Sequence, residues 1–80
     1  MPSSVAVIVT VTQPTALSYV VAWGTDHVRP ATSNLNFQPG QTVSNLVVTA
    51  LGSDGEIELF NLAGSTHLVV DVVGWYGAHT

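Results

Sequence analysis

Residues 33–48 read SNLNFQPGQTVSNLVV, and residues 68–76 read LVVDVVGWY. The first stretch joins Asn-rich turn chemistry to an apolar run, and the second is apolar almost throughout. β-Branched and aromatic residues favour strands over helices. The Pro39-Gly40 pair matches a tight turn that has Pro at its second position and Gly at its third. The two stretches therefore predict β-strands, and no helix, in the second half of the chain.

The rest of the chain repeats this pattern of apolar runs separated by turn residues. Six runs predict strands, at residues 5–12, 18–23, 34–37, 42–51, 56–60 and 67–76. A spacing of about 8–12 residues between strands is typical of sandwiches and barrels. We therefore expect an all-β fold, namely a small antiparallel β-sandwich of about six or seven short strands with Greek-key or jelly-roll-like connections.

Three local patterns give sharper expectations. The odd-numbered valines from 5 to 11 share one face of the first strand, as do Tyr19, Val21 and Trp23 on the second. Pro14 ends the first strand and favours an extended backbone at the residue before it. The sequence Gly52-Ser53-Asp54-Gly55 predicts a β-hairpin, because Asp-Gly supplies the positive φ angles that such turns require. In the last strand, strict alternation places Asp71 on the face of Val69, Val73 and Trp75.

Size and composition bound the domain organisation. Eighty residues allow one domain, 1–80, with residues 1–4 as a candidate flexible or partner-docking arm. A domain this small has a thin core and usually gains stability from disulfides, a metal or a partner subunit. The chain has no Cys, so disulfides are excluded. Association with copies of itself, as a homo-oligomer, or with another protein is the remaining route to added stability.

The charge content is low and one-sided. Only 8% of the residues are charged, against about 25% in an average protein, and Arg29 is the sole strong base at a net charge of −4. Binding to nucleic acid depends on Lys and Arg, so the composition argues against it. No apolar run approaches the roughly 20 residues of a membrane span, so we expect no membrane segment. A surface with few charges to desolvate suits contact with other proteins.

Metal and catalytic sites are not predicted. His27, His67 and His79 lack the spacing that brings three or four ligands together, and the sequence implies no cofactor. A triad of Ser65, His67 and Asp71 does not assemble on one strand, because His67 and Asp71 lie about 13 Å apart along it. Glu56 and Glu58 share one strand face and are interpreted as the solvated side of a hairpin. We therefore expect no enzymatic activity.

Several residues are candidates for contact with a protein partner or a glycan. Asp71 either fixes strand register by accepting backbone or hydroxyl donors, or it contacts a ligand or subunit. Trp75 and Tyr76 point to opposite faces, so one of them lies at the surface as a sugar platform or a protein anchor. The candidate contact residues are Trp23, Asp26, His27, Arg29, Asp71, Trp75 and Tyr76.

A second group has a predicted structural role in turns and in the frame of the sandwich. Asn side chains bond nearby backbone and mimic turns, so the Asn residues around Pro39-Gly40 are interpreted mainly as internal staples, with sugar recognition as the alternative. The frame residues are Asn34, Asn36, Pro39, Gly40, Asn45, Asp54, Gly55 and Gly74.

Four motifs in order resemble a known repeat. They are Val-Thr-Val-Thr-x-Pro-Thr from residue 9, Arg-Pro-x-x-Ser-Asn-Leu-Asn-Phe from residue 29, Pro-Gly-Gln-Thr-Val-x-Asn-Leu-Val-Val from residue 39, and Val-Val-Asp-Val-x-Gly-Trp-Tyr from residue 69. With a Gly-x-x-Gly turn between the last two, this pattern resembles a β-rich repeat of secreted and surface proteins of actinobacteria, over roughly Val9 to Tyr76. The resemblance implies a β-sandwich-like module without catalytic residues.

The setting of the chain shapes the functional expectation. It is a single copy that begins with Met and a stretch lacking a basic signal-peptide region. Structural proteins of actinobacterial phages are made in the host cytoplasm and released by lysis, so the chain resembles a capsid decoration or a head- or tail-associated protein. We expect a virion protein, most plausibly a homotrimer bound to a capsid or other virion protein. The alternatives are a glycan- or cell-wall-binding module at the cell surface and a fragment of a secreted multi-repeat protein.

Overall fold

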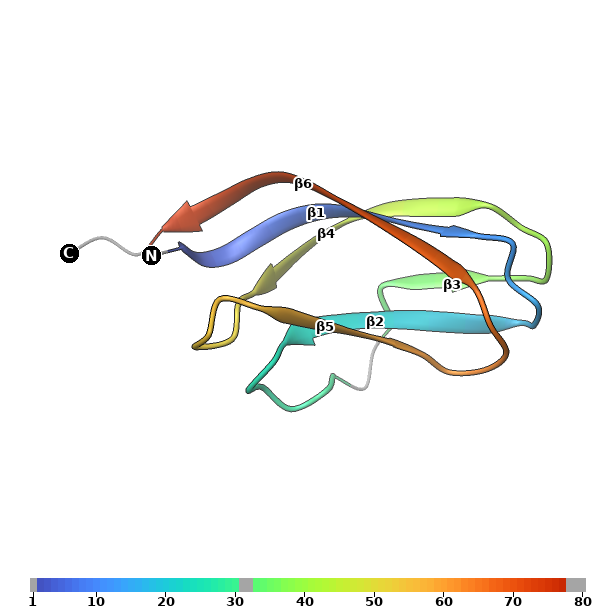
Figure 1. The fold of residues 1–80 in the computed structure, drawn as a ribbon, viewed down its shortest axis with the longest axis horizontal. Helices are drawn as coiled ribbons and strands as arrows, with labels where there is room; N and C mark the ends of the chain where they lie inside the picture. Colours follow the sequence, from blue (N-terminus) through green and yellow to red (C-terminus); the bar gives the residue numbers. More distant parts are fainter. Residues whose placement is uncertain (1, 31–32, 78–80) are drawn as a thin grey trace.

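Six β-strands make up all the regular structure in the computed structural model, which describes residues 2–30 and 33–77. In chain order they are β1 (Pro2–Thr12), β2 (Ser18–Gly24), β3 (Leu35–Phe37), β4 (Val43–Ala50), β5 (Ile57–Asn61) and β6 (His67–Gly77) (Figure 1). Each lies where the sequence predicted a strand, and the described residues contain no helix. The prediction of an all-β fold is confirmed.

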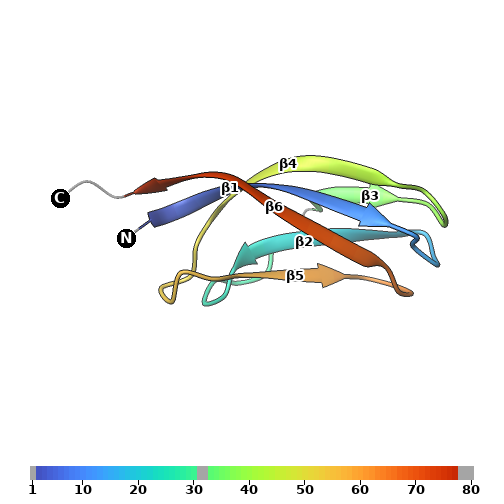
Figure 2. The same ribbon diagram turned by 45° about the horizontal axis from the view of Figure 1, so that its top comes forward.

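The strands form two three-stranded antiparallel sheets. Sheet A has the order β4-β1-β6 and sheet B the order β3-β2-β5. The two sheets lie one above the other, with β1 and β2 as their central strands (Figure 2). The chain is a small antiparallel β-sandwich, as predicted. Among residues 2–30 and 33–77 there is no helix of the length and apolarity needed to cross a membrane.

The odd-numbered valines of β1 form the centre of the core, as their alternation predicted. Val5, Val7, Val9 and Val11 are at most 5% exposed. They pack against an apolar set from the other strands, namely Val20, Ala22, Leu35, Phe37 and Val47. Burying one Val side chain contributes about 1.5 kcal/mol or more, so this one strand supplies a large share of the stability.

The connection between β4 and β5 corrects one expectation. Gly55 donates its N–H to the carbonyl of Gly52 at 2.8 Å and has φ +79°, so a tight turn does form there. However, β4 belongs to sheet A and β5 to sheet B, so the hairpin prediction is wrong. The chain changes sheets where two backbones meet: a Cβ on Gly24 would lie 2.7 Å from the N atom of Gly52. This close approach leaves no room for side chains at the crossing.

Asn34 and Asn45 hold the segment that leads into β3. Asn34 Oδ1 accepts a hydrogen bond from the N–H of Ala22 at 2.7 Å, and the Asn34 N–H donates to the carbonyl of Val20 at 2.9 Å. Asn45 Nδ2 donates to the carbonyl of Asn34 at 2.9 Å. Because Leu35 is the first residue of β3, the side chain of Asn34 extends the bonding between β3 and β2 beyond the strand itself.

The turn at Pro39-Gly40 has the predicted form. Gln41 donates its N–H to the carbonyl of Gln38 at 3.1 Å, which places Pro39 and Gly40 at the two central positions. Gly40 has φ +75°, the left-handed value that this turn requires of its third residue. Its N–H donates to the carbonyl of Pro14 at 2.9 Å, so the turn is tied to the β1–β2 connection.

The ends of β1 differ from the sequence-based expectations. Ser4 pairs with Ala50 of β4 and with Tyr76 of β6, so residues 2–4 form part of the sheet here, whereas Met1 lies outside the described residues. At the other end Gln13 has φ +52° rather than the extended value expected before Pro14. The proline disfavours the right-handed helical region, and the chain reverses between the sheets with a left-handed residue instead.

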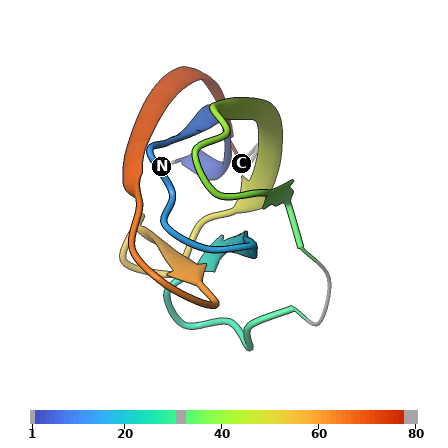
Figure 3. The same cartoon turned by 90° about the vertical axis from the view of Figure 1, so that its right-hand side faces the viewer.

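The outer face of sheet B is partly covered. Val21 points away from the core yet is only 2% exposed. Its cross-strand neighbour is Phe60, and the guanidinium of Arg29 lies 4.0 Å from the Phe60 ring centroid. Residues 25–30, which follow β2, lie on this side of sheet B (Figure 3). Arg29 thus makes a cation–π contact within the chain, typically worth about 0.5–1 kcal/mol at an exposed site.

Candidate functional site

An irregularity in β6 decides which of its side chains share a face. Val7 of β1 lies opposite Val72, but the preceding residue, Ala6, lies opposite Gly74, so Val73 is an extra residue in the ladder. A bulge of this kind reverses the alternation of the strand beyond it. Gly74 has nothing within 4 Å of where a Cβ would stand, so glycine is not required there for lack of space.

The bulge corrects the expected placement of Asp71 and Trp75. Asp71 lies opposite Ile8, whose side chain faces away from the core, whereas Trp75 lies opposite the core residue Val5. Directly opposite residues of an antiparallel pair share a face. Asp71 and Trp75 are therefore on opposite faces of sheet A. The expectation of a shared face is wrong, because it assumed unbroken alternation.

The outer face of sheet A is apolar and exposed. Its rows follow the ladder: Ile8 lies between Leu46 and Asp71, and Ala6 lies between Val48 and Gly74. The large apolar side chains of this face are 36–60% exposed, and they are Ile8, Leu46, Val48, Val69 and Tyr76. Asp71 is the sole charged residue among them. We call this set, with Asp71, the outer face of sheet A.

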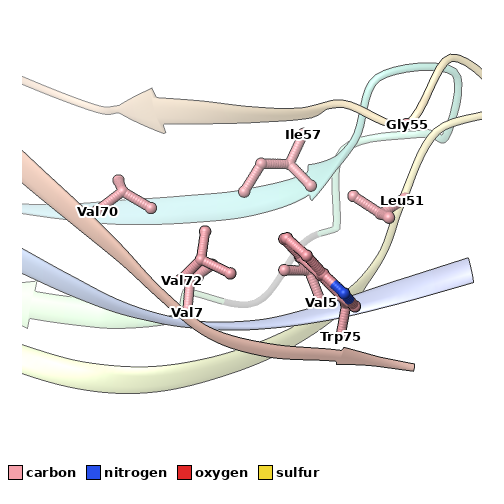
Figure 4. A pocket seen from close by; sticks show the side chains of 8 residues that line it. All are labelled: Val5, Val7, Leu51, Gly55, Ile57, Val70, Val72 and Trp75. Atoms are coloured by element: carbon pink, nitrogen blue, oxygen red, sulfur yellow. The ribbon is translucent and has the colours of Figure 1, made fainter. Parts of the chain in front are cut away.

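A groove opens between the edges of the two sheets, on the inner side of β6. It has a volume of about 410 Å³. Its lining residues, which define the β5–β6 groove, are Val5, Val7, Leu51, Gly55, Ile57, Val70, Val72 and Trp75. Figure 4 shows these side chains around one space between the two sheets, with Trp75 near Val5 and Leu51. The groove therefore has aliphatic and aromatic walls and no charged residue in its lining.

The candidate residues after β2 form a separate polar cluster. Asp26 Oδ1 accepts a hydrogen bond from the Ser53 N–H at 3.1 Å and lies 3.6 Å from Nε2 of His27. Hydrogen bonds from the Ser53 hydroxyl and backbone, with a smaller contribution from His27, hold the pKa of Asp26 below its usual value. Nearby, Asp54 accepts a hydrogen bond from the Thr25 hydroxyl at 2.6 Å. These hydrogen bonds join the residues that follow β2 in sheet B to the residues that follow β4 in sheet A.

The remaining candidates have roles within the chain or stand apart. Trp23 is half-buried on the outer face of sheet B, where it lies opposite Glu58. Tyr76 is exposed, and its carbonyl accepts a hydrogen bond from the Ser3 hydroxyl at 3.2 Å. Asn36 is exposed and accepts a hydrogen bond from the Ser33 hydroxyl at 3.0 Å. The seven candidate contact residues are thus divided between the two sheets and the β2–β3 segment.

Side chains that could ligate a metal do not cluster in the described part of the chain. Residues 2–30 and 33–77 contain no group of three or more His, Asp or Glu residues that could hold a metal ion. His79 lies outside the described residues. Every buried side-chain N or O atom in the described part has a hydrogen-bond partner.

The β5–β6 groove was not predicted from the sequence. Its one sequence signal is that β6, apart from Asp71, is apolar on both faces from Leu68 to Val73, where a strand on the surface of a small domain normally alternates. Which strands border the groove depends on the assignment of β5 and β6 to different sheets, and no local pattern reveals that assignment.

No family model, no curated protein and no solved structure matches this chain. The resemblance to the actinobacterial repeat stays a prediction from the sequence motifs.

Proposed function

We propose that this protein is a non-enzymatic structural protein that acts through protein–protein contacts on the surface of a virion, as a capsid decoration or a head- or tail-associated protein. One observation carries the proposal: most of β6 consists of large apolar side chains exposed to solvent. These residues are Leu68, Val69, Val70, Val72, Val73, Trp75 and Tyr76. The virion setting rests on the sequence motifs and the scarcity of charge.

The exposed apolar area is hard to reconcile with an isolated chain. A soluble monomer rarely exposes a contiguous apolar patch of more than a few hundred Å². Here both faces of one edge of sheet A are apolar, and the neighbouring strands add Ile8, Leu46 and Val48. Covering apolar surface contributes about 25 cal/mol per Å². A partner that covers the outer face of sheet A has a clear driving force and only one carboxylate, Asp71, to satisfy.

Self-association and attachment to a virion protein are both part of the proposal. Light scattering on the purified chain tests the first, with a homotrimer near three times the 8.4 kDa of one chain as the expected state. Mass spectrometry of purified particles tests the second, with stoichiometric amounts of the chain as the expected result. A well-folded monomer that is absent from particles contradicts the proposal.

A matched pair of variants tests the surface. Leu46→Lys puts a charge into the outer face of sheet A, where Leu46 is 57% exposed, and it should weaken association. Val28→Lys puts the same charge at a 92% exposed position of the β2–β3 segment and should leave association unchanged. Equal effects of the two variants would show that the outer face is not the contact surface.

Glycan recognition, the alternative from the sequence, pairs an aromatic ring with an Asn or Asp side chain. Trp75 lines an apolar groove and Asp71 lies on the other face of the sheet, so that pair does not converge on one sugar. A glycan array separates the two functions. Binding that is lost in Trp75→Ala with the fold intact would favour the alternative.

A further inference from the structure

The free edge of β6 is long and has few of the features that protect an exposed edge. Of the strands in the described part of the chain, only β1 is bonded to β6, so the backbone groups on its other side have no ladder partner. β6 has 11 residues and contains neither Pro nor Lys, and the features that protect its edge are one charged residue, Asp71, and the bulge at Val73. The register with β1 is unbroken from His67 to Val72. That part of the edge can accept another strand.

The β5–β6 groove lies directly beside this edge. Val5 and Val7 at its floor are 5% and 1% exposed, whereas Val72 and Trp75 on its wall are 54% and 64% exposed. The groove is therefore lined by buried residues on the β1 side and by exposed residues on the β6 side. An occupant that supplies both backbone hydrogen bonds to β6 and apolar side chains to the groove is an extended β-type segment.

The charges around the groove indicate what kind of segment fits. Asp54 and Glu56 flank Gly55, which lines one end of the groove, and both are exposed. The one strong base of the chain, Arg29, is engaged over Phe60 on the far side of sheet B. A second copy brings a net charge of −4 to these acids, and its sole strong base, Arg29, already lies over Phe60. Charge complementarity therefore favours a basic segment from a different protein.

The direction of the segment follows from the geometry of β6. Gly55 and Leu51 lie at the Trp75 end of the groove, near the C-terminal end of β6 (Figure 4). A segment antiparallel to β6 begins at that end. Its N-terminal residues then lie beside Asp54 and Glu56. Antiparallel pairing is also slightly more stable per residue than parallel pairing.

We propose that the free edge of β6 and the β5–β6 groove form a strand-addition site for an extended apolar segment of another protein, with Lys or Arg at its N-terminal end. This rests on the proposed function, since it names the chemistry of one protein contact. In this proposal the bound segment pairs with the free edge of β6 and covers the apolar lining of the β5–β6 groove.

Synthetic peptides test the site on the full chain. The probe is Lys-Lys followed by residues 4–12 of this chain, because β1 already pairs antiparallel with the other side of β6 with the required alternation. Titration calorimetry and Trp75 fluorescence should show saturable binding that weakens as salt is raised. Two control peptides carry the same residues 4–12, one with Glu-Glu in place of Lys-Lys and one with Lys-Lys moved to the C-terminal end. Each should bind with an affinity at least about tenfold lower.

Variants of the chain locate the peptide. Val72→Asp places a carboxylate in the groove wall and should reduce binding about tenfold or more, whereas Val69→Asp, on the outer face of the same strand, should not. Circular dichroism confirms the fold of each variant, and Trp75→Ala serves if Val72→Asp unfolds. A peptide with Pro in place of its central Ile should bind weakly, because it cannot complete the ladder.

Several outcomes overturn the proposal. It falls if no peptide binds, if the Lys and Glu peptides bind equally, or if Val69→Asp and Val72→Asp have equal effects. It also falls if the chain forms a dimer that Val72→Asp abolishes, since the occupant is then a second copy. If the peptides fail while the chain still assembles on particles, the strand-addition site is wrong and the proposed structural function stands.

Discussion

Asp71 and Trp75 lie on the same strand, four residues apart, and face opposite sides of sheet A. Asp71 lies opposite Ile8 on the outer face, and Trp75 lies opposite Val5 beside the groove. The cause is the extra residue, Val73, in the ladder. In a strand without the bulge, Asp71 and Trp75 would lie on one face. Here Asp71 belongs to the outer face of sheet A and Trp75 to the β5–β6 groove, so the two side chains should contribute independently to stability.

Substitutions at Asp71 and Trp75 should have additive effects on stability. The two side chains share no partner and are separated by the sheet and by about 13 Å along the strand. Sites this far apart normally add within about 0.3–0.5 kcal/mol. Urea unfolding of Asp71→Asn, Trp75→Ala and the double variant, at low protein concentration, measures the coupling. A coupling free energy above about 1 kcal/mol would mean that the two side chains meet on one face.

Val9→Ala should be costly and Val48→Ala should not. Val9 is 1% exposed in the core, and removing two methyl groups there loses transfer free energy and leaves a cavity, for about 2 kcal/mol in total. Val48 is 60% exposed on the outer face of sheet A, so the same change should cost less than about 0.5 kcal/mol. Urea unfolding of the dilute monomer measures both. Similar losses would contradict the assignment of inner and outer faces.

Asn34→Ala should destabilise the chain by about 1–2 kcal/mol. The change leaves the N–H of Ala22, which now donates to Asn34 Oδ1 at 2.7 Å, without its partner. Asn36→Ala is the matched control in the same segment, because Asn36 is exposed and bonds only the Ser33 hydroxyl among the described residues. The control should change the free energy of unfolding by less than about 0.5 kcal/mol. If Asn34→Ala leaves the free energy of unfolding unchanged, the hydrogen bond from the Ala22 N–H to Asn34 does not stabilise the pairing of β2 with β3.

How far the sequence predicts this molecule depends on which features are local. Alternation along a strand is local, and the buried valines of β1 follow from it. Assignment of strands to sheets is not local: the turn at Gly52 to Gly55 forms as expected, but the backbone contact between Gly24 and Gly52 sends the chain to the other sheet. The bulge at Val73 cannot be predicted from the sequence either. Val72 and Val73 are both valine, so either position fits an apolar alternation and the pattern does not show which one is the extra residue.

The carboxyl group of Asp26 should titrate below the usual Asp pKa of about 3.9 in the folded chain. A lowered folded-state pKa contributes stability that is present above the unfolded pKa and is lost as pH falls through the folded value. Side-chain carboxyl NMR measures the midpoint. Ser53→Ala removes the hydroxyl, the largest cause of the shift, and should move the pKa of Asp26 upward while its backbone hydrogen bond remains. An unchanged midpoint would rule out the hydroxyl as the cause.

Gln13→Gly should stabilise the chain. Gln13 has φ +52°, a left-handed conformation that costs a residue with a Cβ roughly 1–2 kcal/mol and costs glycine nothing comparable. The greater freedom of glycine in the unfolded chain returns about 0.4–1 kcal/mol of that gain, so the net increase in the free energy of unfolding should be about 0.5–1 kcal/mol. Gln13 is exposed, so little packing is lost. Gln38→Gly, at another exposed position without a positive φ angle, is the control and should lower stability instead. Thermal and urea unfolding of the two variants give the comparison, and a loss of stability in both would mean that the backbone at Gln13 carries no strain.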